Sequence, residues 1–165
     1  MGSDLQVRPA LPAEYGAVTE ITVAAYVDGG YLPADSAYVA ELGDTLTRAA
    51  GAQIWVATDG DGRVLGSVTW CPLGSTWREI AHDDEGEFRM LAVARDARGR
   101  GVGEALVRAC LDEARAAGLG GVAISTMDKM TDAHRLYERL GFTRVPEADW
   151  SPVNGVCLLA FRVRF

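Results

Sequence analysis

Residues 98–103 read Arg-Gly-Arg-Gly-Val-Gly, and this stretch decides the fold of the 165-residue chain. Residues 87–93 precede it and read as a strand, whereas the residues from Glu104 to Leu111 place apolar side chains three and four positions apart, which is helical spacing. A strand, a glycine-rich turn and a helix together hold phosphate, because glycine lets the backbone come close and a helix N-terminus favours an anion. Arg98 and Arg100 add positive charge and fork-shaped donors.

Two familiar phosphate-binding motifs fit this stretch poorly. A P-loop needs Lys and then Ser or Thr after its last glycine, but Gly103 is followed by Glu104 and Ala105. A dinucleotide-binding fingerprint needs its glycines directly after the strand and a third glycine at the end. Here residues 94–97 intervene, and Ala105 or Leu106 stands where the third glycine belongs. The first motif is excluded and the second is only weakly matched.

The stretch resembles the signature of the GCN5-related N-acetyltransferase (GNAT) superfamily. That signature is Arg or Gln, two residues, Gly, one residue, and Gly or Ala, placed between a strand and a helix, and residues 98–103 match it. About thirty residues later, residues 133–142 match the family's Ala, three residues, Tyr, three residues, Gly-Phe. The two motifs stand in the expected order, so the resemblance covers residues 87–144, with the flanks matched only by pattern.

The resemblance implies one domain over residues 1–165, of the α/β (α+β) class, with a mixed, mostly antiparallel sheet of six or seven strands and helices on both faces. Outside the motifs, residues 53–58 and 64–70 read as a hairpin, and residues 155–165 as a final β-rich run buried on both sides. Residues 34–48 read as one helix, with four side chains expected to point inward: Tyr38, Leu42, Thr45 and Leu46.

The activity that the resemblance implies is transfer of an acetyl group from acetyl-CoA, as co-substrate, to a primary amine by direct attack in a ternary complex, with no metal. The turn and the start of the helix would anchor the pyrophosphate, and backbone groups of the preceding strand would pair with the pantetheine. The implied cofactor-binding residues are Leu91, Ala92, Val93, Arg98, Gly99, Arg100, Gly101, Val102, Gly103 and Glu104.

Tyr137 and Glu87 are the candidate catalytic residues. Tyr137 falls where the family keeps a tyrosine, and a phenol can protonate a departing thiolate, although its spacing also fits an ordinary buried helix face. Glu87 stands four residues before Leu91, the offset of the glutamate in histone-modifying members, although a strand-end acid is the alternative. Another acid or a water chain also remains open as the base. The sequence departs from the family at Met130, where many members have Asn, and at Ser125, which cannot serve as a base.

Charge is distributed unevenly along the chain. Residues 28–87 carry a net charge of −8 and residues 88–144 a net charge of +3, within an overall formal charge of −7. The overall acidity argues against nucleic-acid binding. The acidic part, and above all residues 79–87, would face a cationic amine, unless the acidity only keeps the protein soluble. Five aromatic residues are candidates to line the acceptor pocket: Tyr26, Tyr31, Trp70, Trp77 and Trp150.

Composition limits the remaining possibilities. No apolar run is long enough to cross a membrane, and we expect a cytoplasmic protein that acts on a small-molecule or peptide amine as a monomer or homodimer. We expect Cys71, Cys110 and Cys157 to be reduced, packed thiols, and residues 82–84 to be a solvated loop rather than a metal site. Two rival functions remain: a non-catalytic acyl-CoA-binding sensor or partner module, and an acyltransferase for a longer acyl chain.

Overall fold

The computed structural model of the protein describes residues 4–165, in which one seven-stranded sheet has the order β1-β2-β3-β4-β5-β7-β6. Neighbouring strands are antiparallel except β4 and β5, which are parallel. This is the mixed, mostly antiparallel sheet expected from the sequence. The strands are β1 (Gln6–Pro9), β2 (Gln53–Thr58), β3 (Val64–Cys71), β4 (Glu85–Val93), β5 (Gly121–Met127), β6 (Thr143–Arg144) and β7 (Leu158–Arg164).

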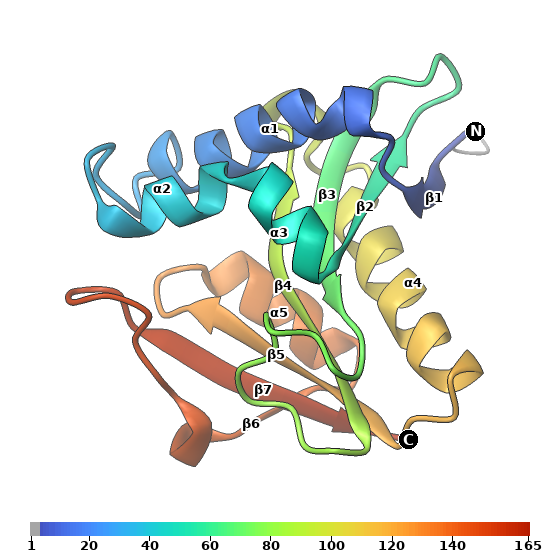
Figure 1. Ribbon diagram of the computed structural model, residues 1–165, viewed down its shortest axis with the longest axis vertical. Coiled ribbons are helices and arrows are strands. Elements are labelled where there is room, and N and C mark those ends of the chain that lie inside the picture. The colour runs from blue at the N-terminus through green and yellow to red at the C-terminus, as the bar shows by residue number, and fades with distance from the viewer. Residues whose placement is uncertain (1–3) are drawn as a thin grey trace.

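Helices cover both faces of the sheet, as expected (Figure 1). One face carries α4 and α5, whose apolar side chains join the main hydrophobic cluster, and the other carries α1, α2 and α3. The helices are α1 (Tyr15–Val27), α2 (Ala37–Gly43), α3 (Thr45–Gly51), α4 (Val102–Ala116) and α5 (Thr131–Arg139). Short 3-10 turns are formed at Pro12–Glu14, Arg95–Ala97 and Pro146–Ala148.

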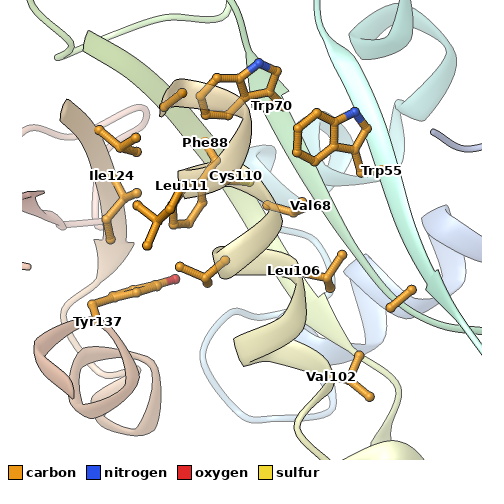
Figure 2. Close-up of a cluster of buried hydrophobic side chains, with 14 of the residues drawn as sticks. Trp55, Val68, Trp70, Phe88, Val102, Leu106, Cys110, Leu111, Ile124 and Tyr137 are labelled. Carbon is orange, nitrogen blue, oxygen red and sulfur yellow. The ribbon is translucent and has the colours of Figure 1, made fainter. Parts of the chain in front are cut away.

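The main cluster lies between α4 and the middle of the sheet (Figure 2). The indoles of Trp55 on β2 and Trp70 on β3 stack with ring centroids 5.7 Å apart, and Phe88 on β4 packs beside them. Leu106 and Cys110 enter from α4, which buries its apolar stripe against these rings. The helical spacing of apolar residues after the glycine turn therefore gives α4 an apolar face, and this face covers one side of the sheet.

Strand β4 contains a bulge at Met90, which has a φ of 56°. Val68 on β3 stands opposite two residues of β4, because Ser67 pairs with Ala92 while Thr69 pairs with Arg89. Beyond the bulge β4 leaves β5, since the two strands pair only from Glu85 to Phe88. Figure 1 shows β4 continuing toward α1 while β5 turns away from it.

The single helix expected over residues 34–48 is wrong. The chain breaks at Asp44, whose φ and ψ of −90° and 64° are not helical and whose side chain accepts a hydrogen bond from the Thr47 amide. Asp44 thus ends α2 and caps α3. The break turns Leu46 outward to 73% exposure and turns Arg48 inward, reversing the expectation for Leu46. Asp and Thr favour such local caps over a continuous helix.

The final β-rich run is shorter and less buried than expected. Strand β7 begins at Leu158, and Arg162 and Val163 are only half-buried. Cys157, just before the strand, is exposed, so the expectation of a packed thiol holds for Cys71 and Cys110 but is wrong for Cys157. Within residues 4–165, no helix combines the length and the apolar character needed to cross a membrane.

Gly86→Ala should destabilise the protein, because a Cβ at this position of β4 would collide with the indole of Trp70, which the stack with Trp55 holds in place. We expect the free energy of unfolding in urea to fall by about 1–3 kcal/mol.

Gly16→Ala is the matched control. Its added Cβ on α1 meets no atom within 4 Å among the described residues, and helical glycine costs conformational entropy. This substitution should raise the free energy of unfolding by about 0.5–1 kcal/mol. Equal effects of the two substitutions would contradict the packing described here.

Candidate functional site

A cleft of about 390 Å³ opens where β4 leaves β5, between the start of α4 and the exposed side of α5. Its walls include every predicted cofactor residue except Arg100, which is exposed on the turn. Residues far apart in the sequence complete the cleft, among them Ala25, Tyr31, Met130, Asp132, Ala133, Leu136 and Arg139. The fold therefore brings the predicted turn and strand together in one cavity.

The floor of the cleft at its α4 end is suited to an anion. Gly99 and Gly101 have φ values of 75° and 78°, a conformation that favours glycine, and Gly101 is the N-cap of the fifteen-residue helix α4. Gly101 has no side chain, so within residues 4–165 no cap oxygen accepts from the first amides of α4. Those amides and the positive end of the helix dipole face the cleft, with exposed Arg98 at its rim.

The carboxylate of Glu104 does not oppose an anion there. It accepts hydrogen bonds from Arg108 at 3.3 Å and from Arg139 at 3.0 Å, and these contacts hold its pKa below the usual glutamate value. Its backbone amide remains part of the first turn of α4. Glu104 therefore contributes to the cleft through the main chain, with its negative charge balanced by two arginines.

The wall opposite the turn is the open edge of β4 from Leu91 to Val93. Ala92 and Val93 pair with β3 on one side, but on the other side β5 has already diverged. Leu91 and Val93 pack toward the main cluster, while Ala92 is buried. Open N–H and C=O groups along a strand edge can bind an extended ligand as an added strand.

A second cleft of about 460 Å³ continues from the first on the side of α1. Ala25, Val93 and Arg98 line both clefts, and Arg95 lines the second. Arg95 was not among the predicted cofactor-binding residues. Its position, as a basic residue between the strand and the glycine-rich turn, was the feature of the sequence that could have indicated a role in phosphate binding.

Tyr137 does not line either cleft. It is 3% exposed on α5, among Phe88, Phe142 and Phe161, whose ring centroids lie 5.8 to 6.1 Å from its own. Its hydroxyl oxygen points toward α4 (Figure 2). Burial raises the pKa of the phenol well above its ordinary value, so the group stays protonated. The adjacent Leu136 is the α5 residue that lines the first cleft.

Glu87 is fully buried in β4, on the face opposite the main cluster. Its Oε1 accepts backbone hydrogen bonds from Glu79, Ile80 and Ala81, each at 3.0 Å, whereas Oε2 has no hydrogen-bond partner within residues 4–165. Burial raises the pKa of the carboxyl, and the three amides oppose that rise. Oε1 of Glu87 thus binds the loop at residues 79–81, whereas Oε2 makes no hydrogen bond to the described residues.

Two of the acidic residues just before Glu87 are paired with arginines and are not free to bind a cationic acceptor. Asp84 accepts from Arg164 at 2.6 Å, and Glu85, buried at the start of β4, accepts from Arg162 at 2.9 Å. Glu85 therefore lies inside a strand and not on the protein surface. Within the described chain, no three His, Cys, Asp or Glu side chains stand close enough to hold a metal ion.

The five aromatic residues expected around the acceptor separate into two groups. Trp70 lies in the main core, so that expectation is wrong for this residue. The other four belong to a second cluster on the face of α1 and α2: Tyr26, Tyr31, Trp77 and Trp150. Tyr31 also lines the first cleft, and Trp77 lines a third cleft of about 490 Å³ beside α3.

Ser125 and Met130 mark the two departures from the family pattern. The indole Nε1 of Trp150 donates to Ser125 Oγ at 2.9 Å, which gives this hydroxyl a structural partner. Met130 is the N-cap of α5 and lines the first cleft with an apolar side chain where many family members have an amide.

Comparisons with known proteins agree with this geometry. A family model described as the acetyltransferase (GNAT) family matches residues 17–142. A GCN5-related N-acetyltransferase structure from Kribbella flavida superposes with a TM-score of 0.70 at 29% identity, covering 98% of each chain.

Two curated relatives match part of the chain. A mycothiol acetyltransferase from Beutenbergia cavernae is 37% identical over 93 residues, 56% of this chain and 29% of the relative. An N-acetylaspartate synthetase from Rattus norvegicus is 29% identical over 134 residues, 77% of this chain and 42% of the relative. The chain thus spans less than half the length of either relative. With the family model spanning most of the sequence and the fold matching along its length, the chain belongs to the acetyltransferase (GNAT) family.

Proposed function

We propose that residues 1–165 form one acetyltransferase domain, which transfers an acetyl group from acetyl-CoA to the primary amine of a small molecule or peptide within a ternary complex. The observation that carries this proposal is the single cleft in which the uncapped N-terminus of α4 meets the open edge of β4. A pyrophosphate needs the first feature and a chain of pantetheine amides needs the second.

Coenzyme A fits the residues that line the clefts. Amides from Gly99 to Glu104 would hold the pyrophosphate, with Arg98 pairing at its edge, and the backbone of Leu91 to Val93 would hold the pantetheine. Arg95 would add positive charge in the second cleft. Met130 offers no hydrogen bond in place of the family's amide, so we assign it only an apolar contact.

The reaction forms a C–N bond and breaks a C–S bond. The acceptor nitrogen attacks the thioester carbonyl, the nitrogen loses a proton, and the departing sulfur gains one. Tyr137, which burial keeps protonated, would supply the proton to the sulfur, and because its side chain is buried outside both clefts, this proton would pass through water. Oε2 of Glu87 would accept the proton from the amine, and because Glu87 is fully buried and outside the described clefts, we assign this transfer to a water chain.

The names of the two relatives support an acetylation reaction. Both are named for acetyl transfer or for an N-acetylated product. The relatives are longer than this chain and match it only in part, so their acceptors are not carried over to it. The acceptor of this chain is instead inferred from its own residues.

A thiol-release assay with acetyl-CoA and a library of amines tests the proposal directly. We expect thiol release that depends on an amine, and tight binding of acetyl-CoA by calorimetry. Binding without turnover on any amine would instead support the acyl-CoA sensor. Faster turnover with longer acyl-CoAs would support the second rival.

Arg98→Gln should weaken acetyl-CoA binding by about 3- to 10-fold, because it removes a charged donor from the rim of the anion site. The dissociation constant from calorimetry at two salt concentrations measures this loss and the reduced dependence on salt. Arg115→Gln on the far end of α4 is the control for loss of one positive charge and should bind normally. Equal dissociation constants for the native protein and both variants would show that Arg98 does not contribute to binding the pyrophosphate.

Tyr137→Phe should lower kcat by about 10- to 100-fold with little change in the melting temperature. The substitution keeps the ring and its contacts with Phe88, Phe142 and Phe161. Steady-state rates and thermal unfolding of the same preparations measure the two effects separately. An unchanged kcat would assign this tyrosine to packing alone.

Glu87→Gln should lower kcat by about 100-fold or more while the loop stays in place, since the amide oxygen can still accept from residues 79–81. In the native protein kcat should fall as the pH drops through a pKa raised above that of an ordinary glutamate, because a protonated carboxyl cannot accept the amine's proton. The variant should lack this acidic limb. A limb that persists and follows the pKa of the amine would show that Glu87 only anchors the loop.

A further inference from the structure

Arg89 is a charged side chain inside the protein with incomplete pairing. It projects from β4 between Glu87 and Leu91 and is only 3% exposed. Its Nη1 donates to the Trp77 carbonyl at 3.2 Å, whereas Nη2 is buried and has no hydrogen-bond partner among residues 4–165. An arginine buried in this state carries a large desolvation cost unless something completes its hydrogen bonds.

Among the described residues, Arg89 has no short-range carboxylate partner. The one carboxylate within 4 Å in the described chain is that of Glu79, at 3.8 Å and 40% exposed. Arg48 on α3 is a second buried guanidinium in this region, and it donates to neutral groups, namely Thr69 Oγ1 and the carbonyls of Glu41 and Leu42. The buried carboxylate of Glu87 makes no ion pair with Arg89 and already serves three amides. No carboxylate in the described chain therefore pairs closely with the guanidinium of Arg89, although Glu41 and Glu79 line the same cleft.

Two indoles fix the orientation of the guanidinium. The ring centroids of Trp77 and Trp150 lie 5.6 and 5.4 Å from its central carbon, and both side chains are half-buried. Cation–π contacts of this kind stabilise the charge without using its N–H donors. A planar guanidinium held between aromatic walls with a donor to spare matches the fork geometry that binds a carboxylate.

The position of Arg89 relates it to the reaction. It lies two residues before Leu91, a separation of about 7 Å along a strand, and Leu91 begins the open edge at the first cleft. By regular alternation from Phe88, Arg89 lies on the face of α1 and α2, where it lines the third cleft with Trp77, Glu41 and Glu79. The second cluster contains Trp77 and Trp150 and also Tyr31 and Met130 of the first cleft, so it extends from Arg89 to that cleft. A ligand that is held by Arg89 and runs along this cluster directs its nitrogen toward the first cleft, where the thioester would lie.

We propose that Arg89 binds a carboxylate of the acceptor, so that the acceptors of this protein are amines that carry a carboxylate, with amino acids as the basic type. The proposal rests on the acetyltransferase function above and specifies its acceptor. It replaces the cationic acceptor suggested by the charge of residues 79–87, because the structure pairs Asp84 and Glu85 with arginines and leaves an arginine unsatisfied instead.

The test compares acceptors that differ only in the carboxylate. Thiol release is measured with each L-amino acid and with the corresponding carboxamide. The carboxamide group lowers the pKa of the neighbouring amine, so each kcat/KM is calculated from the concentration of the unprotonated amine. We expect kcat/KM to favour the acids by at least about tenfold. Equal values, or a preference for the carboxamides, overturn the proposal.

Arg89→Gln should abolish this preference while the rate with carboxamides and the affinity for acetyl-CoA stay within a few-fold of the native values. Arg115→Gln, which removes an exposed arginine on α4, should keep the preference. Circular dichroism and melting temperature establish that each variant is folded. A folded Arg89→Gln protein that still prefers carboxylates overturns the proposal, and if this variant does not fold, the native comparison decides.

A binding measurement separates failure of this proposal from failure of the proposed function. Calorimetry titrates the same amino acids and carboxamides into native protein saturated with coenzyme A, which supports no turnover. If no amine releases thiol, the proposed function fails, yet selective binding of the acids still upholds the role of Arg89. If thiol release occurs and neither measurement favours the acids, the function stands and the carboxylate site does not.

Discussion

The bulge at Met90 is the constraint on which the candidate site depends. An extra residue in β4 opposite Val68 shifts the register against β3 and, beyond Phe88, β4 no longer pairs with β5. A sheet that stayed paired would satisfy the backbone of Leu91 to Val93 internally and leave no open edge. The helix that follows the glycine turn would still present its amides, but a ligand would have nowhere to extend from them.

The same bulge assigns the two faces of β4 to different tasks. Phe88 faces the main core, and after the bulge Leu91 and Val93 face it again, so the apolar face continues past the irregularity. Between them Arg89 and Met90 both face α1 and α2, where regular alternation would have sent one of them into the core. The apolar face stabilises the fold. The polar face holds the buried charges, which cost stability and therefore call for a functional explanation.

Much of the cofactor side could be predicted from the sequence, because glycine spacing, basic charge and helical periodicity are local signals. The acceptor side could not, because it depends on contacts between distant segments. The sequence around Met90 contains no residue that predicts a bulge. The sequence also does not distinguish Trp70, which lies in the core, from Trp77, which lines a cleft. Arg89 was visible as the one basic residue of its strand, yet its two indole neighbours come from other parts of the chain.

There is a physical reason why the cofactor site could be predicted from the sequence and the acceptor site could not. A pyrophosphate can be bound by main-chain amides, which any sequence supplies once glycines allow the turn, so that part of the site is readable from a short motif. An acceptor must be distinguished from other amines, and this requires side chains whose desolvation is compensated only by the right ligand. Buried polar atoms without partners, such as Nη2 of Arg89 and Oε2 of Glu87, are therefore the more informative guide to specificity, and only the folded chain reveals them.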